Sequence, residues 1–78
     1  QEYKMVSIFC DKYNLYKYLI ELAKVQYHDC NILKIRKSKG NTITYSLRSL
    51  DGTHVDNIAR KYGGNGHPMA AGYTISDN

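Results

Sequence analysis

The sequence predicts a small α/β domain with a mixed sheet and helices packed on it. Three observations predict this class: short β-branched and apolar stretches, two stretches with apolar residues at helical spacing, and a length of only 78 residues. The predicted order of elements is β-α-β-β-α-β, with a glycine-rich loop before the last strand. A chain of this length forms one domain at most, and residues 1–78 are interpreted as a domain excised from a larger protein.

The N-terminal part of the chain predicts a strand followed by an amphipathic helix. Residues 5–10 (MVSIFC) are short, apolar and partly β-branched, as is typical of a strand. Asn14 is the predicted N-cap of the helix, which should end near residues 26–27. The apolar stripe expected to face the core consists of Leu15, Tyr18, Leu19, Leu22 and Val25.

The middle of the chain predicts a β-hairpin. Residues 32–37 and 42–49 are strand-like and flank the turn residues 38–41 (SKGN). Apolar and polar residues alternate along the second strand, so one set should face the core and the other should lie on a polar face. The first set is Ile43, Tyr45 and Leu47, and the second is Thr44, Ser46 and Arg48.

A second helix is predicted after the turn at residues 51–52. Thr53 should start it, with Asp56 completing a capping box, and Gly63 should end it as the glycine just past the last turn. Residues 73–76 form the predicted last strand. The apolar face of this helix consists of Val55, Ile58, Ala59 and Tyr62.

The glycine-rich loop is the segment in which we look for chemistry. Gly63, Gly64 and Gly66 lack a Cβ, so their N–H groups can converge into a nest that binds an anion. Residues 67–71 are expected to form a short helical turn whose N-terminus points at the nest. His67 can donate a hydrogen bond to a phosphate oxygen. The alternative interpretation is an ordinary helix-to-strand loop with a surface histidine.

Composition limits the partners. Eleven Lys and Arg against seven Asp and Glu give a net charge of +4, which is compatible with a polyanionic partner and equally with simple solubility. Cys10 and Cys30 are too few for a disulfide scaffold and indicate either free thiols in a reducing compartment or buried apolar residues. A cytoplasmic location is expected. No apolar run is long enough to span a membrane, and no membrane partner is expected.

Three ordered motifs resemble those of one known family. Residues 63–73 (GGNGHPMAAGY) are similar to the Gly-Gly-Gly-His-x-x-Ala-Ala-Gly signature of the DHH-associated domain, the C-terminal domain of the DHH phosphoesterase superfamily. Residues 44–49 (TYSLRS) resemble its Ser-Leu-Arg-Ser strand, and residues 53–64 resemble the helix before the signature. Asn65 departs from the third glycine, but asparagine is the residue that best replaces glycine in left-handed conformations.

This resemblance implies a function and a set of site residues. The superfamily includes RecJ-like single-strand exonucleases, nanoRNases and cyclic-dinucleotide phosphodiesterases, so the parent protein is expected to be a manganese-dependent phosphodiesterase or exonuclease. Its metal ions would be held by an N-terminal DHH domain, which would also be a partner of this one. Short single-stranded nucleic acid or a nucleotide phosphate would be the ligand. The implied substrate-binding residues are Arg48, Gly64, Asn65, Gly66 and His67.

The resemblance also implies what this chain lacks. It contains no Asp-His-His motif, so no catalytic residue and no metal ligand is assigned within it, and the domain alone is expected to be inactive. Two alternatives remain open at this stage. One is a non-catalytic nucleic-acid-binding module such as the related domain of alanyl-tRNA synthetases. The other is an interaction domain whose glycine loop is purely structural.

Overall fold

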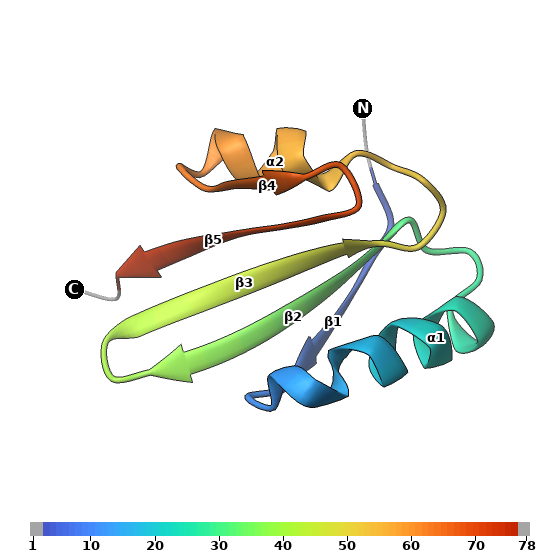
Figure 1. Ribbon diagram of the computed structural model, residues 1–78, viewed down its shortest axis with the longest axis horizontal. Coiled ribbons are helices and arrows are strands. Elements are labelled where there is room, and N and C mark those ends of the chain that lie inside the picture. Colours follow the sequence, from blue (N-terminus) through green and yellow to red (C-terminus); the bar gives the residue numbers. More distant parts are fainter. Residues whose placement is uncertain (1–2, 77–78) are drawn as a thin grey trace.

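The computed structural model describes residues 3–76 as a mixed five-stranded sheet with a helix on each face (Figure 1). The strand order is β1-β2-β3-β5-β4, with β1 parallel to β2 and every other neighbouring pair antiparallel. The predicted α/β class is therefore confirmed. In chain order the elements are β1 (Met5–Phe9), the 3₁₀ turn η1 (Tyr13–Leu15), α1 (Tyr16–Gln26), β2 (Ile32–Lys39), β3 (Thr42–Ser49), α2 (Val55–Lys61), β4 (Asn65–His67) and β5 (Ala70–Ser76).

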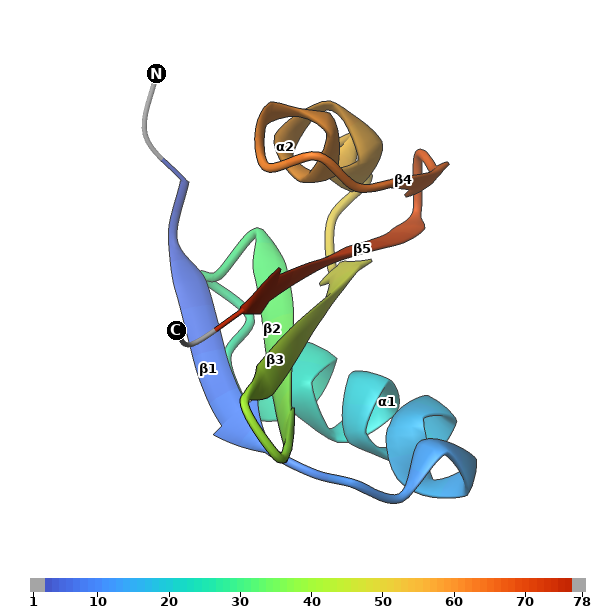
Figure 2. The same ribbon diagram turned by 90° about the vertical axis from the view of Figure 1, so that its left-hand side faces the viewer.

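The two helices cover different strands on opposite faces of the sheet. Figure 2 shows α1 and α2 on opposite sides of the sheet. Side chains of α1 pack on β1 and β2, whereas α2 lies along β4 and β5. Successive residues of a strand point to opposite faces, so β2 contributes Leu33 and Ile35 to the α1 side and Ile32 to the α2 side. Across residues 3–76 neither helix has the length and hydropathy needed to cross a lipid bilayer.

The predicted helix N-cap at Asn14 is wrong. The α-helix begins at Tyr16 after a single 3₁₀ turn, and its N-cap residue, Leu15, makes no side-chain capping hydrogen bond. The end of the helix at Gln26 is as predicted.

The buried face of α1 also differs from the predicted stripe. Tyr16 and Ala23 are buried with Leu33 and Ile35, whereas Val25 is 74% exposed. Two sets of apolar residues share helical spacing in this segment, so periodicity alone does not choose between them. Because Ala23 is small, the helix can lie close to the sheet when the side that carries Ala23 is turned towards it. The set packed on the sheet is Tyr16, Leu19, Ile20 and Ala23, and the exposed set is Leu15, Tyr18, Leu22 and Val25.

The β2–β3 hairpin confirms the predicted strands and the predicted alternation. β2 runs two residues further than expected, to Lys39, so the turn between the strands is only residues 40–41. On β3, Leu47 is buried against α2 and Tyr45 packs against the same cluster. Arg48 lies on the opposite face, as the alternation predicted, since its guanidinium rests on Tyr16 of α1.

The N-terminus of α2 is held by a distant carbonyl rather than by a capping box. The Val55 N–H donates to the Pro68 carbonyl at 2.8 Å. The Thr53 hydroxyl donates to Asp51 at 2.6 Å instead of to the helix, and Asp56 forms an ion pair one turn further along. The predicted capping box is therefore wrong, because tertiary structure supplies the acceptor that the side chain would have provided.

The C-terminus of α2 ends as the sequence predicted. Gly63 has φ 85°, its N–H donates to the Arg60 carbonyl at 3.2 Å, and the Gly64 N–H donates to the Ala59 carbonyl at 2.9 Å. This pair of hydrogen bonds is the Schellman motif, which needs the left-handed conformation that glycine adopts without strain.

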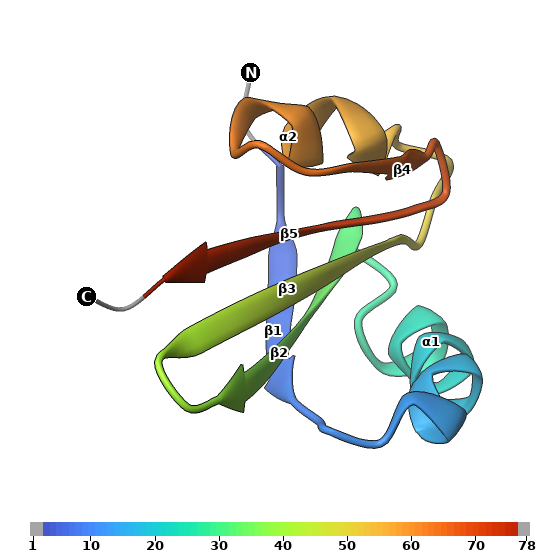
Figure 3. The ribbon, with the colours of Figure 1, turned by 60° about the vertical axis from the view of Figure 1, so that its left-hand side comes forward.

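The segment after α2 is a second hairpin, which the sequence analysis did not predict. β4 pairs with β5 through a turn at residues 68–69, and β5 begins at Ala70 rather than at residue 73 (Figure 3). The predicted helical turn over residues 67–71 is wrong. A Cβ on Gly66 would lie 2.5 Å from the Ala71 Cα, and one on Gly64 would overlap the Gly72 carbonyl oxygen. The glycines therefore allow two backbones to touch.

Replacing Gly64 by alanine tests this close approach. Gly64→Ala is expected to lower the free energy of unfolding by about 3 kcal/mol, because the backbone of β5 must move to admit the methyl group. The control is Gly40→Ala, at φ 60° in the open β2–β3 turn, where only backbone strain of about 1 kcal/mol is expected. Urea unfolding measures both, and equal losses would contradict the close packing.

Asp51 joins the start of β2 to the segment that leads into α2. Its carboxylate accepts the Thr53 hydroxyl, the Thr53 N–H at 3.1 Å and the Asn31 side-chain amide. The hydrogen bonds from Thr53 and then from Asn31 lower the pKa of Asp51.

This lowered pKa predicts a pH-dependent stabilisation. It should be fully present above the unfolded-state pKa of about 4 and should be lost as the pH falls through the lower folded-state pKa. Asp51→Ala should therefore cost about 1 kcal/mol of unfolding free energy or less at pH 7, since the carboxylate is exposed. The destabilisation caused by Asp51→Ala, measured by urea unfolding, should be smaller at about pH 2.5, below the ordinary pKa of about 4, than at about pH 7. A difference independent of pH would contradict the assignment.

Candidate functional site

One half of a sheet face is left uncovered by α1. On this face β3, β5 and β4 present only small and polar side chains, whereas the apolar positions of the same face lie under α1 on β1 and β2. We call this surface the open face. It consists of Thr44, Ser46 and Arg48 on β3, Ala70, Gly72 and Thr74 on β5, and Asn65 and His67 on β4.

The strand register places three of the predicted site residues together on the open face. Arg48 pairs with Ala70, and Ala70 pairs with His67 on its other side. Residues paired directly across antiparallel strands point to the same face, so Arg48 and His67 flank Ala70. In the next row Asn65 pairs with Gly72. Two strand spacings separate the Arg48 and His67 backbones by roughly 10 Å, with only a methyl group between them.

Arg48 is half-buried, and it makes a single hydrogen bond within the described residues. Its Cζ lies 5.5 Å from the centre of the Tyr16 ring, and Nη1 donates to the Leu47 carbonyl at 3.2 Å. Between residues 3 and 76 no acidic side chain forms an ion pair with it. A guanidinium has five N–H donors, so Arg48 is oriented by an aromatic ring while retaining donors for an anion.

His67 is exposed but stands on a fixed backbone. The turn that follows it is tied to two other elements, because the Pro68 carbonyl accepts the Val55 N–H and the Met69 carbonyl accepts the Ser49 N–H at 3.0 Å. These bonds link the β4–β5 turn to the start of α2 and to the end of β3. The imidazole of His67 therefore projects from a rigid hairpin rather than from a loose loop.

The glycines are placed differently from the predicted nest. The N–H groups of Gly63 and Gly64 are used in the Schellman motif, and Gly66 lies within β4. The nest of converging N–H groups is therefore not formed by Gly63 and Gly64. Gly64 and Asn65 instead line a hollow of about 320 Å³ that reaches Thr44 and Gly72 on the open face.

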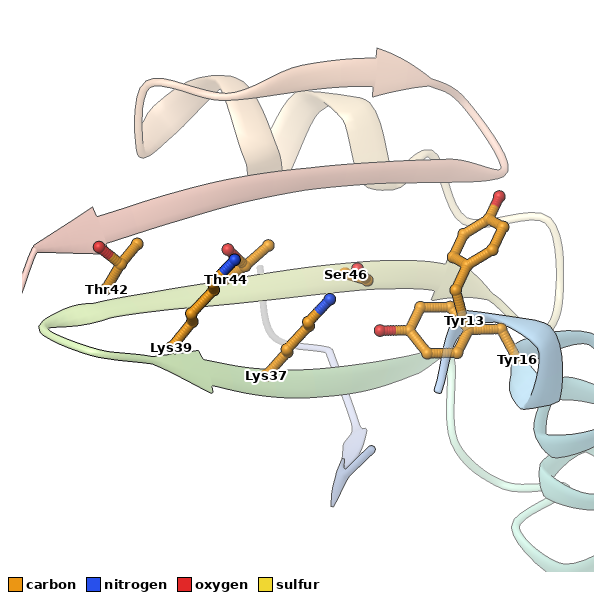
Figure 4. Close-up of a pocket in the computed structure, with 7 residues that line it drawn as sticks. All are labelled: Tyr13, Tyr16, Lys37, Lys39, Thr42, Thr44 and Ser46. Carbon is orange, nitrogen blue, oxygen red and sulfur yellow. The ribbon is translucent and has the colours of Figure 1, made fainter. Parts of the chain in front are cut away.

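Two further hollows continue the open face towards α1. One, of about 320 Å³, lies against Arg48, Tyr13, Tyr16 and Lys17. The other, of about 530 Å³, lies between η1 and the β2–β3 hairpin, with Lys37 and Lys39 on its rim (Figure 4). Among the described residues that line these three hollows, none is acidic, so the surface favours an anionic ligand.

Sequence reasoning missed the lysines and tyrosines of this surface. A signal for the lysines was present, because Lys37 and Lys39 follow Leu33 and Ile35 at every second position of β2. Residues spaced in this way point to the same face of a strand. The approach of Tyr13 depends on where α1 docks, which the sequence did not show.

In the part of the chain that the structure describes, no group of three or more His, Cys, Asp or Glu side chains is placed to hold a metal ion. Cys10 and Cys30 are both unpaired thiols.

Comparison with known proteins identifies the family. The DHHA1 domain family matches residues 11–78, which is most of the chain, and the chain therefore belongs to it. No curated protein sequence matches the chain. Among solved structures, the pGpG-specific phosphodiesterase PggH from Vibrio cholerae superimposes with a TM-score of 0.66 at 19% identity over 97% of this chain. The chain spans 29% of the length of that protein.

Proposed function

We propose that this chain is the substrate-binding domain of a phosphodiesterase of the DHH superfamily, acting on short single-stranded nucleic acid or on a dinucleotide. The observation that carries this proposal is the row Arg48–Ala70–His67 across β3, β5 and β4. A phosphate seated over Ala70 would lie between the two strands that carry these hydrogen-bond donors. The Arg48 guanidinium can bind two of its oxygens at once, and the His67 imidazole can donate to a third.

The comparisons support the class of substrate. The DHHA1 family is associated with DHH phosphoesterases, and PggH is named as specific for the dinucleotide pGpG. The acid-free lining of the open face suits the phosphates of such a ligand.

The role of this domain in the reaction would be to orient the substrate. The described residues do not cluster as metal ligands, so the manganese ions expected for the parent enzyme would be held by its DHH domain. Arg48 and His67 would hold the phosphate and balance its charge, while Gly72 and Ala70 leave room for it to lie close to the sheet. Holding the substrate in this way would lower the entropy cost of bringing it into the geometry needed for reaction.

Substitution of the two donors tests the proposal. Arg48→Ala is expected to weaken binding of a 5′-mononucleotide by about tenfold, because a charge-assisted pair of hydrogen bonds is lost. Arg48→Lys should recover part of this loss, since it keeps the charge without the planar fork. His67→Ala should weaken binding by a few fold.

NMR titration of each variant gives the dissociation constants. The matched control is His28→Ala, an exposed histidine after α1 and away from the open face. Unchanged affinity in Arg48→Ala and His67→Ala would contradict the phosphate site, and an equal loss in His28→Ala would show that the effect is nonspecific.

A further inference from the structure

A groove beside the phosphate site combines cations with an exposed aromatic ring. It lies between η1, the start of α1 and the β2–β3 hairpin, and has a volume of about 530 Å³. In Figure 4 the two lysine side chains reach across β3, the Tyr16 ring points towards Lys37, and the Tyr13 ring stands beside Tyr16. We call it the lysine–tyrosine groove. It is lined by Tyr13, Tyr16, Lys37, Lys39, Thr42, Thr44 and Ser46.

The two lysines bring positive charge together without compensation. They are two residues apart on β2 and pair with Thr44 and Thr42, so both ammonium groups stand on the same face. Elsewhere Lys4 and Lys24 form ion pairs with acidic neighbours, but within residues 3–76 neither groove lysine does. Like charges held this close favour an anion between them.

Tyr13 offers a surface for stacking. Its side chain is 74% exposed, and its ring packs at 5.1 Å against the ring of Tyr16, which is only 6% exposed. Tyr16, the first residue of α1, is fixed in turn because its side chain is buried between α1 and the sheet. An exposed ring supported from behind by a buried one is a preformed platform for a nucleic-acid base.

The groove adjoins the open face and shares Thr44 and Ser46 with it, but its lysines stand further along the sheet than Arg48. Thr44 belongs both to the groove and to the hollow beside Gly64, and Tyr16 lies between the groove and Arg48. The strand positions of Arg48 and Thr44 are four residues apart, or roughly 13 Å. A ligand that fills both sites therefore needs more than one phosphate along a flexible backbone.

We infer that the lysine–tyrosine groove is a second nucleotide subsite, which takes the neighbouring nucleotide of a single-stranded oligonucleotide. Lys37 and Lys39 bind its phosphate, Tyr13 stacks on its base, and the Thr44 and Ser46 hydroxyls face its sugar. This inference rests on the proposed function, because Arg48 and His67 are taken to hold the first phosphate. It predicts that affinity depends on ligand length.

The test compares a 5′-mononucleotide with a 5′-phosphorylated trinucleotide on the 78-residue chain, with affinities from NMR titration. The wild type should bind the trinucleotide at least tenfold more tightly than the mononucleotide. The double variant Lys37→Gln/Lys39→Gln should bind the mononucleotide as the wild type does and lose most of this gain. For the trinucleotide, the plot of log affinity against log salt should become less steep in this variant, by about 0.7 for each phosphate contact removed.

Two further variants separate charge from stacking. Lys24→Gln/Lys61→Gln removes the same charge from helix positions outside the groove, and it should keep the gain with length. Tyr13→Leu should reduce trinucleotide affinity about fivefold and leave the salt slope unchanged.

The outcomes distinguish this subsite from the proposed function. Loss of the length-dependent gain in the groove variants alone, with mononucleotide binding intact, supports the subsite. A gain that survives in Lys37→Gln/Lys39→Gln, or an equal loss in the charge-matched control, overturns the subsite and leaves the Arg48–His67 site standing. Absence of binding by either ligand at millimolar concentration overturns both.

Discussion

Direct contact between backbones in the β4–β5 hairpin is the constraint on which the rest of the structure depends. Gly64 and Gly66 let the segment after α2 lie against β5, where any side chain would meet main-chain atoms. Once β4 is seated, the Pro68 carbonyl is in place to accept the Val55 N–H at the start of α2. The same contact thus fixes a helix, a turn and the strand that carries His67.

This constraint gives the glycine-rich motif a structural meaning beside its functional one. Its glycines bring a short strand close to a neighbour and end a helix, and the N–H groups of Gly63 and Gly64 are consumed in doing so. The groups of this strand that can contact a ligand are therefore the side chains of Asn65 and His67. A phosphate at this site would be bound by side-chain donors rather than by a cradle of backbone N–H groups.

Sequence patterns predicted the parts of the fold that depend on local rules. Alternation along residues 42–49 placed Arg48 on the polar face, and the glycine after the second helix marked its end correctly. Two of the failures come from contacts between residues that are distant in sequence. The sheet determines which side of α1 is buried, and Pro68 supplies the acceptor at the start of α2. The β4–β5 hairpin is local in sequence, but it depends on the close approach of two backbones that Gly64 and Gly66 allow.

The candidate site was likewise predicted in part by local patterns and in part determined by contacts between strands. Its members come from three strands, and the register that brings them into one row could not be obtained from the motifs alone. The motifs supplied the identity of Arg48, Asn65 and His67, and the structure supplied their common face. The lysine–tyrosine groove had no motif to mark it, because it forms only where the start of α1 meets the β2–β3 hairpin.

The central claim is that the open face of β3, β5 and β4 binds phosphate. The most direct test is a map of amide chemical-shift changes on adding a 5′-phosphorylated dinucleotide to the labelled chain without metal. The account predicts changes along β3, β5 and β4 around Arg48, Ala70 and His67, which weaken as salt is raised. Changes confined to α2 or to the opposite face around Lys34 and Tyr45, or insensitivity to salt, would contradict it.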